Sequence, residues 1–169
     1  LAAKAASLRG LGRCKWILGD HEASYHLLHE AFDAMQQIGS LEGIVSCLCE
    51  LGIEESEYGH YSRARVALQE GLSLARQLRD EDEVANLEHE LGLVEAKDGQ
   101  ASKAETLFRS ALAHARLGGI PTRIATSAKE LAVLALRRHD VDTAESLEAE
   151  STKLLEAAGE KYLLAHNLQ

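Results

Sequence analysis

Two segments of the chain carry the pattern that decides its fold. Residues 51–71 read LGIEESEYGHYSRARVALQEG, and residues 91–111 read LGLVEAKDGQASKAETLFRSA. Each segment opens with Leu-Gly, has a second glycine seven residues after the first, and places small residues five and twelve residues beyond that. The two segments are 40 residues apart. A step of this length indicates a supersecondary unit that has been copied and stacked against its neighbours.

The same register extends along the whole chain. Five positions recur at 40-residue steps without insertion or deletion: Leu11, Leu51, Leu91 and Leu131; Gly12, Gly52 and Gly92; Gly19, Gly59 and Gly99; Ser24, Ala64, Ala104 and Ala144; Ala31, Gly71, Ala111 and Ser151. The small residues are interpreted as packing positions that let helices approach closely. We expect one domain over 1–169, with repeats at 1–40, 41–80, 81–120 and 121–160 and a partial fifth at 161–169.

Composition favours helices. The chain is 46% hydrophobic and 27% charged, with 4% aromatic residues and one proline, and Ala, Leu and Glu dominate. Its formal net charge of −9 argues against nucleic-acid binding through bulk charge. No apolar run approaches the roughly 20 residues that span a bilayer, so no membrane partner is expected. Three cysteines, Cys14, Cys47 and Cys49, indicate a reducing, cytoplasmic location. Because the chain begins with Leu, we expect a piece of a larger protein.

Each repeat contains two amphipathic patterns joined by a short turn. The patterns predict helices at 2–18, 21–38, 41–58, 61–78, 81–98, 101–117, 121–138 and 141–157, with a ninth beginning near 160. Asp20, Ser40, Asp80 and Asp140 are the predicted N-caps, and Asp80 has the spacing of a capping box with Glu83. In the fourth repeat His139 replaces the turn glycine, which should weaken that turn slightly. Connections this short predict antiparallel helix pairs.

These residues resemble the tetratricopeptide repeat. The resemblance lies in Leu51-Gly52, Gly59, Ala64 and Gly71, and again in Leu91-Gly92, Gly99, Ala104 and Ala111. The early Trp and the closing Pro of the family pattern are absent, and the period is 40 where the family's is about 34. The resemblance implies an all-α fold, a right-handed α-solenoid of antiparallel helix pairs. Long repeats of this kind are similar to those of kinesin light chains and of large bacterial ATPase-type transcriptional regulators.

The family binds its partners in a concave groove made by the first helix of each repeat. Carrying its groove positions onto this sequence gives Arg9, Arg13, Trp16, Cys49, Ile53, Asn86, His89, Lys97, Lys129, Val133 and Arg137 as the main candidate peptide-binding residues. The full set of transferred positions has five Arg or Lys residues and one Glu, which favours an acidic protein or peptide partner. Trp16, the only tryptophan, would be an apolar anchor. A solvated basic face, with Trp16 packing on a preceding repeat, is the alternative.

Other chemistry is weakly indicated. His26, His29 and Asp33 share one helical face, but we interpret them as surface residues and expect no metal and no cofactor. Glu54, Glu55 and Glu57 are interpreted as a solvated charged face. There is no nucleotide-binding loop, nucleophile motif or paired buried carboxylate in the sequence, so we expect no enzymatic activity.

The function predicted from the sequence is a non-enzymatic module that binds a peptide or helical segment, as the sensor or scaffold part of a larger regulator. One alternative is end-to-end self-association, or a structural role, through the apolar residues Tyr162, Leu163, Leu164 and Leu168. Another is a domain of a bacterial transcriptional regulator that senses a small-molecule effector, which would require a closed pocket with converging polar groups.

Overall fold

The computed structural model describes residues 2–159 and is helical along that length. The helices in chain order are α1 (Ala2–Ile17), α2 (His21–Ile38), α3 (Leu41–Glu57), α4 (Tyr61–Leu78), α5 (Glu81–Lys97), α6 (Ala101–Gly118), α7 (Pro121–Arg137) and α8 (Val141–Ala158). Each predicted helix is confirmed to within one residue at either end. The predicted ninth helix and the apolar residues of the self-association alternative lie outside the described residues.

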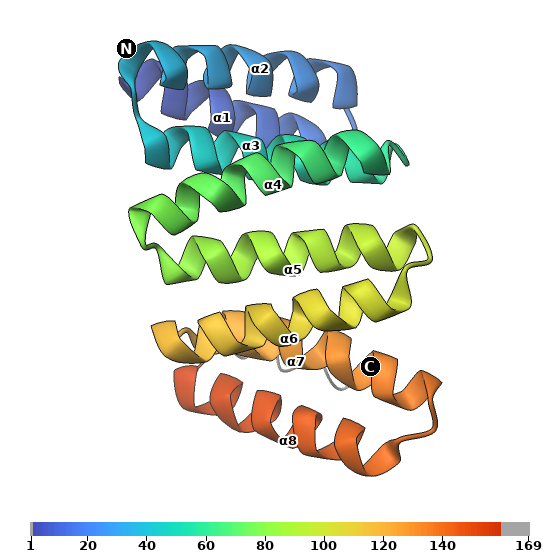
Figure 1. Ribbon diagram of the computed structural model, residues 1–169. Helices are drawn as coiled ribbons and strands as arrows, with labels where there is room; N and C mark the ends of the chain where they lie inside the picture. The colour runs from blue at the N-terminus through green and yellow to red at the C-terminus, as the bar shows by residue number, and fades with distance from the viewer. Residues whose placement is uncertain (1, 160–169) are drawn as a thin grey trace. The chain divides into compact units, whose positions relative to one another are not determined.

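The chain divides into two compact units, with the boundary between Asp80 and Glu81. In the first unit, α1 packs on α2, α2 on α3 and α3 on α4; in the second, α5 to α8 pack in the same order. Figure 1 shows that consecutive helices within each unit run in opposite directions, as the short connections predicted. The all-α fold of antiparallel helix pairs is therefore confirmed within each unit. The single domain and the right-handed superhelix stay predictions.

The recurring glycine on the first helix of a pair marks a close approach to the second helix. A Cβ atom built on Gly52 would lie 2.5 Å from Cγ of Leu68, and one built on Gly92 would lie 2.5 Å from Cε1 of Phe108. At Gly12 the same contact, with Leu28, is 3.1 Å. A large side chain on the second helix thus fills the space that the missing Cβ leaves. The packing interpretation of this glycine ladder is confirmed.

The turn inside each repeat needs one residue in the left-handed conformation. Gly99 has φ of +76°, and its counterpart His139 adopts the same region with φ of +61°. The junction between repeats has a similar requirement, which Arg79 meets with φ of +58° where other junctions have glycine. Residues other than glycine uncommonly adopt this region, although Asn, Asp and His do so more often than the rest. His139 therefore has the unfavourable backbone conformation that was expected to weaken its turn, and Arg79 has the same conformation at a junction between repeats.

Side-chain caps begin several of the helices. Asp20 accepts a hydrogen bond from the backbone N–H of Ala23, and Asp140 accepts one from Thr143. Ser40 caps α3 in the same way. These three predicted N-caps are confirmed, and the capping box of Asp80 stays a prediction. Among residues 2–159, no helix combines the length and the apolar character needed to cross a bilayer. The cytoplasmic location stays a prediction.

Candidate functional site

The predicted groove residues belong to both units of the structure. Arg9, Arg13, Trp16, Cys49 and Ile53 lie in the first unit, and Asn86, His89, Lys97, Lys129, Val133 and Arg137 lie in the second. In the first unit the structure gathers three of the five around a pocket, and in the second it places part of the set on one exposed helical face.

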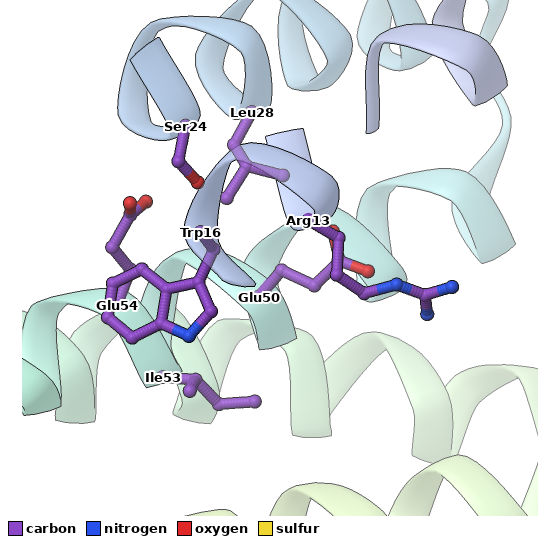
Figure 2. A pocket seen from close by; sticks show the side chains of 7 residues that line it. All are labelled: Arg13, Trp16, Ser24, Leu28, Glu50, Ile53 and Glu54. Carbon is purple, nitrogen blue, oxygen red and sulfur yellow. The ribbon is translucent and has the colours of Figure 1, made fainter. Parts of the chain in front are cut away.

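The pocket of the first unit lies between α1, α2 and α3 and has a volume of about 180 Å³. Its lining residues, drawn in Figure 2, are Arg13, Trp16, Ser24, Leu28, Glu50, Ile53 and Glu54. The predicted residues Arg13, Trp16 and Ile53 are brought together here. The other four lining residues were not among the predicted site residues: Ser24 was interpreted as a packing position and Glu54 as part of a solvated face, and Leu28 and Glu50 were not singled out.

Trp16 forms one wall of this pocket and is held by other aromatic rings. Its indole meets the ring of His21 edge-on, with centroids 4.4 Å apart, and that of Tyr58 at 6.5 Å. The turn that positions these rings is fastened by Lys15, whose Nζ donates to Asp20 across 2.8 Å. Trp16 remains half-buried, so part of the indole is available to a ligand.

Glu54 is the most unusual residue of the pocket. It is 2% exposed, and among residues 2–159 neither of its carboxylate oxygens has a hydrogen bond of normal geometry. Burial raises the pKa of Glu54, while the nearby Ser24 hydroxyl and His21 oppose that rise. The interpretation of Glu54 as part of a solvated face was wrong, because α2 covers this side of α3. Glu57 at the end of the helix is exposed, as predicted.

The remaining predicted residues of the first unit are tied to the protein itself. Arg9 approaches Glu50, with Nη1 and Oε1 3.8 Å apart, so its charge is partly balanced. Cys49 is only 5% exposed and offers little surface to a partner. The first unit therefore has no uniformly basic face at this point: two cations, Arg9 and Arg13, stand beside two carboxylates, Glu50 and Glu54.

In the second unit, Asn86 and His89 take part in internal packing. Arg123 on α7 reaches across to α5, where it donates to Asp82 over 2.8 Å and to the Asn86 side-chain oxygen over 2.7 Å. The His89 ring packs on Phe108 at 5.4 Å. Burial lowers the pKa of His89 to about 4, and the charge of Arg123 adds to this effect. Arg123, which the sequence analysis did not single out, thus connects α7 with α5.

The exposed face of α7 carries the other predicted residues. Lys129, Val133 and Arg137 follow one another at four-residue steps, so they share one side of the helix with Leu136. Val133 is 36% exposed and Leu136 is 52% exposed. Lys97, the remaining candidate, is exposed at the end of α5. The four residues Lys129, Val133, Leu136 and Arg137 are called the α7 stripe below.

Glu130, next to the α7 stripe, is a half-buried carboxyl group. Burial raises its pKa, and the charges of Lys129 and Arg137 oppose that rise. The stripe therefore presents two cations and two exposed apolar side chains beside a carboxyl group that is held nearer its neutral form. Such a surface has the charge and the apolar area to attract an acidic, partly apolar segment.

The resemblance found in the sequence is confirmed by comparison with known proteins. Residues 3–77 match the family model of the tetratricopeptide repeat. No curated protein matches the chain in sequence.

Solved structures match the helices over nearly the whole chain. Aspartyl phosphate phosphatase F from Bacillus subtilis matches 98% of the chain with a TM-score of 0.90 and 14% identity. The Rap conjugation gene regulator of the plasmid pLS20, in complex with the Phr* peptide, matches 98% with a TM-score of 0.86 and 17% identity. The chain spans 44% and 46% of the lengths of these two proteins.

A third solved structure contains repeats of a putative kinesin light chain from Podosopora anserina, with nearly identical TPR-like repeats. It matches 99% of the chain, and the match covers 93% of that protein, with a TM-score of 0.69 and 16% identity. Identities this low show the fold alone. The chain is thus similar to helical repeat proteins of the tetratricopeptide type.

Proposed function

We propose that this protein is a non-enzymatic interaction module that binds a peptide or helical segment of a partner protein, as the sensor or scaffold part of a larger regulator. Helical repeats of the tetratricopeptide type commonly act as scaffolds that bind other proteins, each with its own surface. The observation that carries the proposal is the α7 stripe, on which two exposed apolar side chains lie between two cations.

The geometry of the α7 stripe suggests what the partner looks like. Lys129 and Arg137 are eight residues apart, which is about 12 Å along a helix. Val133 and Leu136 lie between them and are exposed enough to be covered by a partner. A segment with acidic residues at both ends of a short apolar stretch would match this surface. The net charge of −9 would meanwhile disfavour nucleic acid.

The comparison with the Rap conjugation gene regulator gives the proposal further support, since that protein of the same fold was solved with the Phr* peptide. At 17% identity, and with the chain spanning 46% of that regulator, the peptide is a property of the regulator alone. It indicates that a fold of this kind is able to hold a peptide.

A second candidate function is the sensing of a small effector molecule. The pocket between α1, α2 and α3 has converging polar groups, which is the feature that this alternative requires. Its volume of about 180 Å³ falls below the roughly 300–1,000 Å³ of sites for drug-sized ligands. A single side chain of a bound partner fits the pocket better than a whole effector molecule, so we place the peptide proposal first.

The proposal can be tested by selecting peptides from a displayed random library on the purified protein and measuring Kd by fluorescence anisotropy. We expect acidic, partly apolar peptides whose affinity falls at least about 10-fold when Lys129→Glu and Arg137→Glu are combined. A control with Lys103→Glu and Lys153→Glu changes the net charge equally on the exposed faces of α6 and α8. Equal losses in both variants, or no selected peptide, would contradict the proposal.

A further inference from the structure

The pocket of the first unit holds a buried acidic group, Glu54. Both oxygens of Glu54 are buried without a hydrogen bond of normal geometry within residues 2–159, and so is the hydroxyl oxygen of Ser24. Figure 2 shows the Ser24 side chain of α2 at the same end of the pocket as the Glu54 carboxylate. A carboxylate that is buried without a hydrogen-bond partner destabilises the folded state.

The fold itself does not require these polar groups. Eighty residues further on, the second unit has Leu134 where the first has Glu54, Ala104 where it has Ser24, and Ala96 where it has Trp16. Ala104 and Leu134 belong there to one buried hydrophobic cluster with Phe108. The second unit therefore fills this position between its helices with apolar side chains, whereas the first unit has polar groups there.

The walls of the pocket suit an aliphatic stem. Leu28 and Ile53 line it together with the half-buried indole of Trp16. The Arg13 guanidinium points away from the indole in Figure 2, so Arg13 contributes mainly its methylene chain here. Two carboxylates, Glu50 and Glu54, line the same cavity, and Arg9 approaches only Glu50 in the ion pair described above. Apolar walls with acidic groups disfavour an anion and favour a cation that is carried on a hydrocarbon chain.

The chemistry of an ammonium group matches what the pocket lacks. A lysine ammonium supplies three donors, enough for the two oxygens of Glu54 and the hydroxyl of Ser24. The electron-rich face of an indole attracts such a cation as well. Because burial raises the pKa of Glu54, the empty pocket holds the carboxyl group nearer its neutral form, and a bound cation would favour the ionised form.

We propose that the pocket between α1, α2 and α3 binds the side chain of a lysine on the partner segment, with Glu54 as the acceptor of its ammonium group. This inference rests on the proposed function, since the lysine belongs to the bound peptide. It adds a specific requirement to that function. A partner segment that binds the first unit would carry a lysine.

The test uses Trp16 as its reporter, because it is the only tryptophan and lines the pocket. The purified protein is titrated with Nα-acetyl-lysine methylamide and with Nα-acetyl-norleucine methylamide, which has a similar stem without the charge. We expect the lysine probe to bind at least about 10-fold more tightly, and this preference to be lost in Glu54→Leu. Glu148→Leu, which removes a carboxylate from α8, should keep the preference.

Three results would overturn the inference. The first is an equal affinity for the lysine and norleucine probes, and the second is a lysine preference that survives in Glu54→Leu. The third comes from a titration with 1,5-diaminopentane: tighter binding of this free diamine than of Nα-acetyl-lysine methylamide would assign the pocket to a small amine instead. The peptide selection that tests the α7 stripe is a separate measurement. A failure of the lysine-pocket proposal is therefore distinguishable from a failure of the proposed function.

Discussion

Glu54 on α3 occupies the repeat position that Leu134 holds on α7, and both side chains are buried. Leu134 lies in a hydrophobic cluster, whereas the Glu54 carboxylate faces a pocket without a hydrogen bond of normal geometry in the described part of the chain. One backbone environment thus accepts either an aliphatic side chain or an acid. The difference indicates that the first unit carries an energetic cost at Glu54 that the second unit avoids.

Replacing the acid with its counterpart should stabilise the first unit. We expect Glu54→Leu to raise the free energy of unfolding at pH 7 by about 1–3 kcal/mol, since it removes a buried unsatisfied group. Because burial raises the pKa of Glu54 in the folded state, the cost grows as pH rises through that pKa, and the gain should shrink in acid. Urea denaturation of the native protein and of Glu54→Leu, at pH 7 and in acid, measures the effect. A variant that is less stable than the native protein at pH 7 would refute this reasoning.

The close approach of α5 and α6 at Gly92 should not tolerate a methyl group. Gly92→Ala would place Cβ 2.5 Å from the Phe108 ring, so we expect a loss of about 1–3 kcal/mol. Gly10→Ala is the matched control, because Gly10 lies in α1 with nothing within 4 Å of the added atom. That change should stabilise the helix by about 1 kcal/mol. Thermal unfolding followed by circular dichroism separates the two, and similar shifts in Tm would contradict the packing role.

The turn at His139 should improve with glycine. His139 has φ of +61°, a conformation that glycine adopts freely, so His139→Gly is expected to stabilise the protein by about 1 kcal/mol. The reciprocal change, Gly99→His, places histidine at the equivalent position with φ of +76° and should destabilise by a similar amount. Chemical denaturation gives the change in the free energy of unfolding for each variant. Changes of opposite sign would support the backbone explanation, and changes of the same sign would refute it.

His89 should make the protein sensitive to acid. Its pKa is lowered to about 4 by burial, while an unfolded histidine titrates near 6.5, so the unfolded state binds a proton first as pH falls. Stability is therefore expected to fall between about pH 6.5 and pH 4, by about 2–3 kcal/mol from this residue. Denaturation curves of the native protein and of His89→Leu over this range test it. An unchanged pH slope in His89→Leu would show that the loss has another source.

The three cysteines should differ in reactivity toward a disulfide reagent. Cys14 is exposed, while Cys47 and Cys49 are buried. Burial raises the pKa of Cys47 to about 11, so about one in a thousand of these thiols is ionised at pH 8. We expect one thiol per molecule to react rapidly and two only after unfolding. Cys14→Ser should abolish the rapid phase, and a rapid phase that remains would contradict the burial of the other two.

The helices could be predicted closely from the sequence because their signals are local. Asp20, Ser40 and Asp140 each cap a helix with their own side chain, and a glycine in the left-handed conformation follows most of the helices. The resemblance to the tetratricopeptide repeat likewise pointed to Trp16 and Ile53, because the family's groove positions could be carried onto the 40-residue register. Propensity, caps and spacing act over a few residues, so they are readable without knowledge of the neighbouring helix.

The candidate site was less readable because its character depends on residues from different helices. Glu54 reads as one of several glutamates near the end of a helix, and only the position of α2 shows that it is buried. Asn86 and His89 were expected to face a partner, yet the structure places them against Arg123 and Phe108. The sequence did contain one signal that Glu54 is buried: the third and fourth repeats have the apolar residues Val94 and Leu134 at the same repeat position.

The sequence by itself determined the repeat, the eight helices, their antiparallel pairing within each unit, and the contacts that the small residues allow. Each of these follows from local propensity and from a period that is repeated along the chain. Only the tertiary structure decided which charges are buried and which side chains share a pocket. Burial and pKa depend on what neighbouring helices bring within a few ångströms, and in the first unit α2 covers Glu54 while Ser24 and Trp16 lie beside it.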